Sequence, residues 1–98
     1  MAIDELSVEF KRRLFDALEQ SRALGYDGAD MENMLSRQNA VELAKKLVLS
    51  GVIQGGPKKM AKINRKDLTV ESIMMDPQFA PLFERKYLEA AEFRLGQM

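Results

Sequence analysis

The sequence predicts an all-α fold, a compact orthogonal bundle of five or six short helices in which residues 1–98 form a single helical domain. Apolar residues recur along the chain at spacings of three and four, which is the period of one face of a helix. Glycine, proline and asparagine interrupt this pattern, and no stretch alternates apolar and polar residues between turns as a half-buried strand does. A chain of 98 residues with 46% hydrophobic content is long enough for one core and too short for two.

The first and longest helix is predicted within residues 4–25. Its apolar stripe consists of Leu6, Phe10, Leu14, Phe15 and Leu18. Gly25 is placed to end this helix, because glycine adopts the left-handed conformation at little cost. Asp30 is predicted to cap a short second helix, since its carboxylate can accept hydrogen bonds from the free amides of the first turn. This second helix carries Met31, Met34 and Leu35.

Asn39, followed three residues later by Glu42, resembles a capping box and predicts the start of a third helix. The buried face of the third helix is expected to consist of Val41, Ala44, Leu47 and Val48. Ser50-Gly51 marks its end, and Gly55-Gly56 then breaks the chain. Pro57 suits the first turn of a short helix over residues 57–64, in which Met60 and Ile63 would point toward the core.

Thr69 is predicted to cap the next helix, which carries Val70, Ile73 and Met74 inward. Asp76-Pro77 is predicted to stop that helix and to start a single turn in which Phe79, Leu82 and Phe83 fill the core. Pro81 argues against a long continuous helix here. A last helix is predicted from Glu84 to Leu95, with Gly96 as its terminator. The predicted core consists of Leu14, Leu18, Val41, Ala44, Leu47, Val70, Ile73, Phe83, Leu88, Ala91 and Leu95.

The order of segments GY, AVELAKKLV, DLTVES, PQFAPLF and YLEAAEFRL resembles a small uncharacterised bacterial helical domain found in hypothetical proteins. The resemblance covers roughly residues 10–95. Its most specific part is the closing half, which carries Leu68-Thr69-Val70-Glu71, Leu82-Phe83 and then Ala91, Arg94 and Leu95. The resemblance implies no biochemical activity.

The charges of this formally neutral chain are unevenly distributed. Residues 37–66 carry a net charge of +7, between −4 for residues 1–36 and −3 for residues 67–98. The cations considered as partner-binding residues are Lys58, Lys59, Lys62, Arg65 and Lys66, preceded by Lys45 and Lys46. If residues 57–64 are helical, Lys58, Lys59 and Lys62 share one side and form a basic ridge. The competing interpretation is a solvated face paired with acidic neighbours.

Direct binding of nucleic acid is the other interpretation of the basic ridge. Counterion release would favour it, although no aromatic residue interrupts the lysines as a stacking platform would. A helix-turn-helix formed by residues 40–50 and 57–64 would have an unusually long connection, GVIQGG. Its second helix would also contain no arginine, asparagine or glutamine to read base edges. Sequence-specific readout is therefore not expected.

The chain contains no cysteine and no histidine, which removes the thiolate nucleophile, the zinc knuckle and the usual general base. Glu71 and Arg94 are predicted to form a buried or half-buried ion pair. The alternative role, a catalytic carboxylate, finds no second acid or base in the pattern. Met74 and Met75 point about 100° apart on a helix, so Met75 is expected near the surface as part of an apolar patch with Phe79. No enzyme activity, metal or cofactor is expected.

These observations favour a non-enzymatic protein-interaction module that uses a basic ridge and an apolar patch. The most specific hypothesis within this class is a phage or mobile-element inhibitor of a bacterial defence complex, similar to an anti-CRISPR protein in size and charge asymmetry. The alternative is a small nucleic-acid-binding regulator. The expected partner is a protein, with a nucleoprotein complex or nucleic acid as further alternatives, and the oligomeric state is left open. The first residues do not resemble a secretion signal and no apolar run could span a bilayer, so a cytoplasmic protein with no membrane partner is expected.

Overall fold

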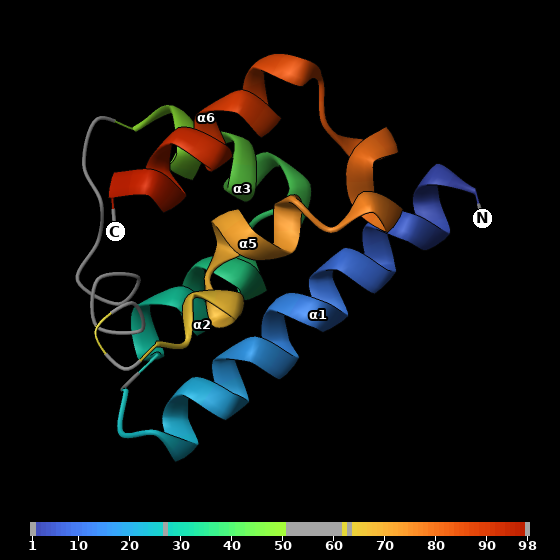
Figure 1. Ribbon diagram of the computed structural model, residues 1–98. Coiled ribbons are helices and arrows are strands. Elements are labelled where there is room, and N and C mark those ends of the chain that lie inside the picture. The colour runs from blue at the N-terminus through green and yellow to red at the C-terminus, as the bar shows by residue number, and fades with distance from the viewer. Residues whose placement is uncertain (1, 27, 51–61, 63, 98) are drawn as a thin grey trace.

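A computed structural model describes residues 2–26, 28–50, 62 and 64–97 (Figure 1). Every regular element within these ranges is a helix, which confirms the predicted all-α class. Of the predicted short helix over residues 57–64, only Lys62 and Asn64 lie within the described ranges. Lys62 is helical and exposed, and Asn64 adopts a left-handed conformation with φ of 60°. Lys58, Lys59, Met60 and Ile63 lie outside the described residues.

Helix α1 (Ile3–Ala23) runs along one side of the molecule (Figure 1). Its buried face consists of Leu6, Phe10, Leu14, Ala17, Leu18 and Ser21, which extends the predicted stripe toward the C-terminus, while the predicted Phe15 is half-buried. On the opposite face Arg12 forms ion pairs with Glu9 and Asp16, which are three and four residues away. The helix ends as predicted, because Gly25 adopts a φ of +95° and turns the chain toward α2.

Helix α2 (Ala29–Arg37) begins one residue before the predicted cap. Asp30 was expected to cap this helix, and the prediction is wrong: Gly28 occupies the N-cap position and Asp30 lies inside the first turn. Close packing explains the difference, since a Cβ atom at Gly28 would lie 1.9 Å from Cδ1 of Leu18 in α1. Any larger residue here would displace the Leu18 side chain, so glycine permits the close contact with α1. Asp30 still lies in the first turn, where a negative charge favours the helix dipole.

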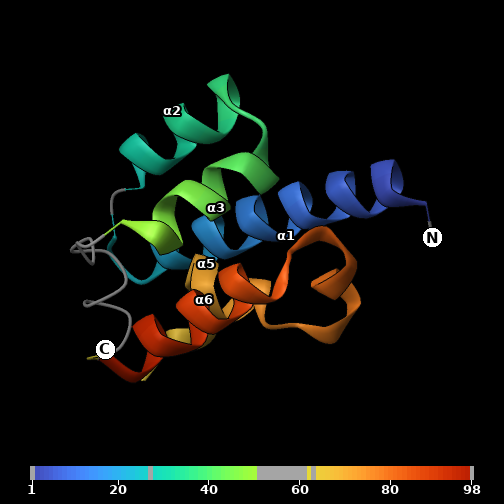
Figure 2. The same ribbon diagram turned by 90° about the horizontal axis from the view of Figure 1, so that it is seen from above.

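Helix α3 (Ala40–Leu49) follows as predicted, with Asn39 as its cap. The Asn39 side-chain oxygen accepts hydrogen bonds from the amides of Val41 at 2.9 Å and Glu42 at 3.2 Å. The Glu42 side chain interacts with Lys45 at 3.4 Å. The cap thus fixes the start of α3, where it crosses α1 (Figure 2).

The closing half consists of two short 3-10 helices and two α-helices: η1 (Lys66–Leu68), α5 (Val70–Met74), η2 (Pro77–Leu82) and α6 (Arg85–Gln97). Thr69 caps α5 as predicted, because its hydroxyl accepts a hydrogen bond from the Ser72 amide at 3.2 Å. Asp76 does the same for η2 through the Gln78 amide at 3.1 Å. Gly96 does not terminate the last helix, which continues through it to Gln97.

The centre of the core is a cluster of three phenylalanine rings. Phe10 of α1 contacts Phe79 and Phe83 edge to face, with ring centroids 5.2 Å apart in both pairs. The structure confirms the burial of Leu14, Leu18, Val41, Ala44, Ile73, Phe83 and Ala91. Leu47, Val70, Leu88 and Leu95 are only half-buried, and the first three pack against the edge of the core. The buried residues missing from the predicted core include Leu6, Phe10, Leu35, Leu43, Met74 and Phe79.

Replacement of Phe10 by alanine is expected to lower the free energy of unfolding by about 3–5 kcal/mol, because it removes a fully buried ring and both edge-to-face contacts. Chemical denaturation followed by circular dichroism measures this loss. Phe93→Ala is the matched control, since Phe93 is 69% exposed and its loss should change stability by no more than about 0.5 kcal/mol. Equal effects of the two substitutions would contradict the assigned core.

Candidate functional site

Five of the seven cations considered as partner-binding residues lie within the described ranges: Lys45, Lys46, Lys62, Arg65 and Lys66. The predicted ridge of Lys58, Lys59 and Lys62 lies outside the described residues except for Lys62, and the five described cations come from separate parts of the chain. Lys45 and Lys46 lie on α3, beside α6 and α2 respectively, whereas Arg65 and Lys66 lie at the start of the closing half. Their contacts therefore have to be considered one by one.

Arg65 forms an ion pair with Asp67 and a hydrogen bond with Gln20. Its guanidinium donates hydrogen bonds to Asp67 at 3.1 and 3.2 Å and to the Gln20 side chain of α1 at 3.2 Å. The hydrogen bonds from Arg65 hold the pKa of the Asp67 carboxyl below its usual range, and the same hydrogen bonds raise the pKa of Arg65. Both groups are charged at neutral pH, so the charge of Arg65 is neutralised locally. For this residue the paired interpretation holds.

Lys66 contacts the C-terminal end of α6. Its ammonium group donates a hydrogen bond of 3.2 Å to the backbone carbonyl of Leu95, in the last turn of α6. The final carbonyls of a helix lack partners inside the helix and carry the negative end of its dipole, so a lysine is favourable there. Lys66 thereby ties the start of η1 to the end of α6.

Lys45 lies in a cluster that brings α3 and α6 together. Its ammonium group lies 5.3 Å from the centre of the Tyr87 ring, and the Lys86 ammonium group lies 5.0 Å from the same ring. Cations at these distances are attracted by the electron-rich face of an aromatic ring. We call Lys45, Lys86 and Tyr87 the Tyr87 cluster. Sequence reasoning missed it, because Lys45 and Tyr87 become neighbours only through the packing of α3 on α6.

Two predicted cations project into solvent without a carboxylate. Lys46 is exposed and donates to the neutral Gln38 side chain at 3.4 Å. Lys62 is exposed, and no ion pair joins it to any residue in the described part of the chain. Lys66 is exposed and lacks a carboxylate partner among the described residues as well, but its ammonium group binds the Leu95 carbonyl.

Glu71 forms the predicted buried ion pair with Arg94. The Arg94 Nε atom donates to Glu71 Oε2 at 3.2 Å, and the two side chains are only 5% and 2% exposed. Arg94 Nη1 also donates to the backbone carbonyl of Ser50 at 2.9 Å. A carboxylate held by a buried guanidinium has a structural partner, which supports its structural interpretation.

The predicted apolar patch around Met75 and Phe79 is only half correct. Met74 is fully buried and Met75 is 36% exposed, as the helical geometry predicted. Phe79 is wrong as a surface residue, because its side chain is fully buried against Phe10 and stacks below the Arg13 guanidinium. More exposed apolar side chains lie elsewhere: Val8 at 70%, Phe93 at 69% and Leu49 at 59%.

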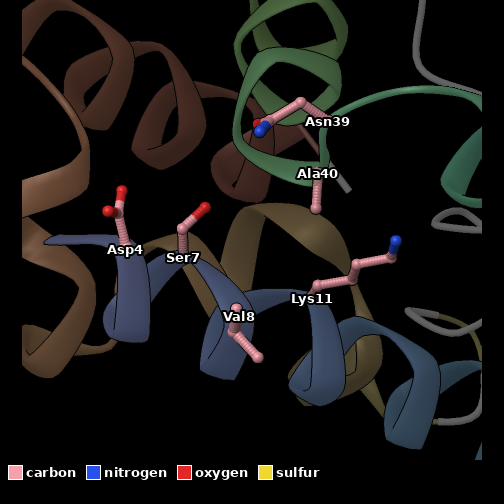
Figure 3. Close-up of a pocket in the computed structure, with 6 residues that line it drawn as sticks. All are labelled: Asp4, Ser7, Val8, Lys11, Asn39 and Ala40. Carbon is pink, nitrogen blue, oxygen red and sulfur yellow. The ribbon is translucent and has the colours of Figure 1, made fainter.

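Two surface pockets lie beside α1. The larger, with a volume of 310 Å³, lies between α1 and the start of α3 and is lined by Asp4, Ser7, Val8, Lys11, Asn39 and Ala40 (Figure 3). The smaller, of 190 Å³, is lined by Arg13, Asp16, Ala17, Gln20, Asp67, Leu68 and Ile73. Neither pocket contains a predicted partner-binding residue. Within the described ranges, no group of three or more acidic side chains could hold a metal ion.

Comparisons with protein-family models, with curated proteins and with solved structures found no match for this chain. In the part of the chain that the structure describes, no helix has the length and apolar character needed to cross a membrane. Function therefore has to be argued from the contacts and charges above.

Substitution of one or both residues of the Glu71–Arg94 pair tests how much the pairing of these buried charges stabilises the fold. Arg94→Met is expected to lower the free energy of unfolding by about 3–5 kcal/mol, because it leaves the buried Glu71 carboxylate without its cation. The double variant Glu71→Leu, Arg94→Met should recover most of this loss, since no buried charge remains. Thermal and chemical denaturation measure both.

Arg85→Met is the control for that test, because the Arg85–Glu89 pair has the same chemistry but side chains that are 91% and 62% exposed. Its loss should cost less than about 1 kcal/mol. A double variant as unstable as Arg94→Met alone would show that the cost comes from side-chain packing and not from the unpaired charge.

Proposed function

We propose that this protein is a non-enzymatic interaction module that binds an acidic surface of a protein partner through residues 37–66. The observation that carries the proposal is the charge distribution. Residues 37–66 contain eight cations and one anion, and the flanking segments carry the compensating negative charge. Attraction of this kind is long-ranged at low ionic strength and accelerates association with a complementary surface.

The contacts of the described cations leave residues 37–66 with an excess of unpaired positive charge that a partner can contact. Arg65 is neutralised by Asp67, and Lys45 lies 3.4 Å from Glu42, the one anion of the segment. Lys46 and Lys62 are exposed, and neither forms an ion pair with a carboxylate in the described part of the chain. Local pairing therefore removes part of the charge of the segment and leaves most of it for a partner.

Helix α3 is suited to present such charges because both of its ends are held. Asn39 caps its start, and Arg94 binds the carbonyl of Ser50 just after its end. The backbone of a helix held in this way loses little freedom when a partner binds, which lowers the entropic cost of association.

In its most specific form, we propose a phage or mobile-element protein that inhibits a bacterial defence complex by binding a subunit that itself handles nucleic acid. Small size, the absence of cysteine and the asymmetric charge support this form. The resemblance of the closing half to a bacterial helical domain is consistent with a bacterial or phage origin.

A nucleic-acid-binding regulator is the second candidate, and the Tyr87 cluster favours it. An aromatic ring beside lysines is the arrangement used to bind single strands, in which phosphates contact cations and bases stack on rings. Tyr87 is half-buried and has Lys45 and Lys86 within about 5 Å of its ring centre. The sequence alone offered no aromatic residue among the lysines of the segment.

Reversal of Lys46 and Lys62 to glutamate is expected to remove most recovery of the protein partner, by at least about tenfold, because it replaces two attractions with two repulsions. Affinity capture from the native host followed by quantitative mass spectrometry measures the recovery. The control variant, Arg22→Glu with Arg85→Glu, changes the net charge equally at exposed cations outside residues 37–66. Undiminished capture by the Lys46, Lys62 variant would contradict the proposal.

Binding to a random DNA duplex and to a mixed-sequence single strand separates the two candidates. A nucleic-acid-binding regulator should bind at about 50 mM salt and lose affinity steeply by about 200 mM. For this candidate, Tyr87→Ala should weaken single-strand binding more than duplex binding, because stacking requires an unpaired base. Fluorescence anisotropy measures both kinds of binding. A protein-interaction module should bind neither the duplex nor the single strand in this assay, and it should be captured from the host in a stable complex with a protein.

A further inference from the structure

The first turns of α1 extend beyond the rest of the bundle and leave one side open. In Figure 2 the N-terminal part of α1 projects past the start of α3, while η2 lies against its other side. The open side carries Asp4, Val8 and Lys11, which are four and three residues apart and therefore form one stripe on the helix. We call these three residues the α1 stripe.

The α1 stripe combines two unmatched charges with an exposed apolar residue. Asp4 and Lys11 are both exposed, and no ion pair joins either of them to any other residue in the described ranges. Two helical turns separate them, about 10.5 Å along the axis, which is too far for them to pair with each other. Between them Val8 is 70% exposed, the highest exposure among the large apolar residues that the structure describes.

The pocket of 310 Å³ lies directly beside the α1 stripe. In Figure 3 the side chains of Asp4, Ser7 and Lys11 rise from α1 on the side of Asn39 and Ala40, at the start of α3. Side chains of a partner helix lying along the stripe would enter this recess. The face is thus hollowed, partly apolar and flanked by opposite charges at its two ends.

We propose that the α1 stripe binds a second copy of this chain, with the two α1 helices antiparallel about a two-fold axis near Ser7 and Val8. The charge pattern complements itself in this arrangement, since Asp4 of each copy would lie opposite Lys11 of the other. A two-fold interface needs this property, because any contact between two different positions occurs twice. The two Val8 side chains would meet close to the axis and bury apolar surface.

The contact is short, about three helical turns, so the dimer is weak and dissociates on dilution. We expect the average mass of the wild-type protein to rise from 11.1 kDa toward twice that value between about 0.1 and 1 mM protein. Sedimentation equilibrium of the purified protein measures this mass. An increase in salt to about 1 M should weaken the dimer, because it shortens the screening length to about 3 Å.

Charge reversal provides the decisive comparison. Asp4→Lys and Lys11→Asp are each expected to weaken self-association by at least about tenfold, because each creates two like-charge contacts across the two-fold axis. An equimolar mixture of the two variants should associate again, since every contact between them is attractive, and so should the variant that carries both substitutions. Glu5→Lys is the control for Asp4→Lys, with the same change in net charge at an exposed residue outside the stripe.

Three results would overturn the proposal: a wild-type protein that stays monomeric at about 1 mM, single variants that associate like the wild type, or single variants whose mixture stays monomeric. A monomeric wild type would leave the face to a partner other than a second copy. Circular dichroism shows whether each variant is folded. The double variant and the mixture carry the same substitutions as the single variants, but in both of them residues 4 and 11 of opposing chains again have opposite charges. The experiment contains only the purified chain, so its outcome is independent of the proposed acidic partner.

Discussion

The buried contact between Glu71 and Arg94 is the interaction on which the arrangement of the closing half depends. One guanidinium binds the Glu71 carboxylate of α5 at 3.2 Å and the Ser50 carbonyl after α3 at 2.9 Å, while its own backbone belongs to α6. Removal of two charges from water costs several kcal/mol each, and only close pairing with further hydrogen bonds offsets this cost. No buried side-chain nitrogen or oxygen in the described part of the chain lacks a hydrogen-bond partner, so the pair is well accommodated.

This contact also positions the surfaces that the functional proposals use. Because Arg94 binds the Ser50 carbonyl, it holds the end of α3, the helix that carries Lys45 and Lys46. The same packing of α6 on α3 brings Tyr87 and Lys86 to Lys45. The phenylalanine cluster holds the other end of the fold, where η2 covers Phe10 and leaves the opposite side of α1 open for the α1 stripe. The buried ion pair and the phenylalanine cluster thus support two different surfaces of the same bundle.

Features that depend on local chemistry could be predicted from the sequence. Asn39 and Thr69 cap the helices that follow them, and Gly25 adopts the left-handed conformation after α1, because each needs only its own backbone neighbours. Features that depend on packing could not. Gly28 and not Asp30 occupies the N-cap of α2, in close contact with Leu18 of α1. Phe79 was predicted both inside the turn and in the surface patch, and only its contact with Phe10 of α1 decides for burial. The Tyr87 cluster joins residues from two helices, so no local spacing indicates it.

Amide hydrogen exchange of the Glu71→Leu, Arg94→Met double variant, followed by NMR, tests the organising role of the ion pair most directly. This variant lacks the contact to Ser50 but contains no unpaired buried charge, so its overall stability should stay close to that of the wild type. Faster exchange is expected in the last turn of α3 and in α6, with protection in α1 and α2 unchanged. Unchanged exchange at the end of α3 would show that apolar packing alone holds these helices together and that the ion pair does not position them.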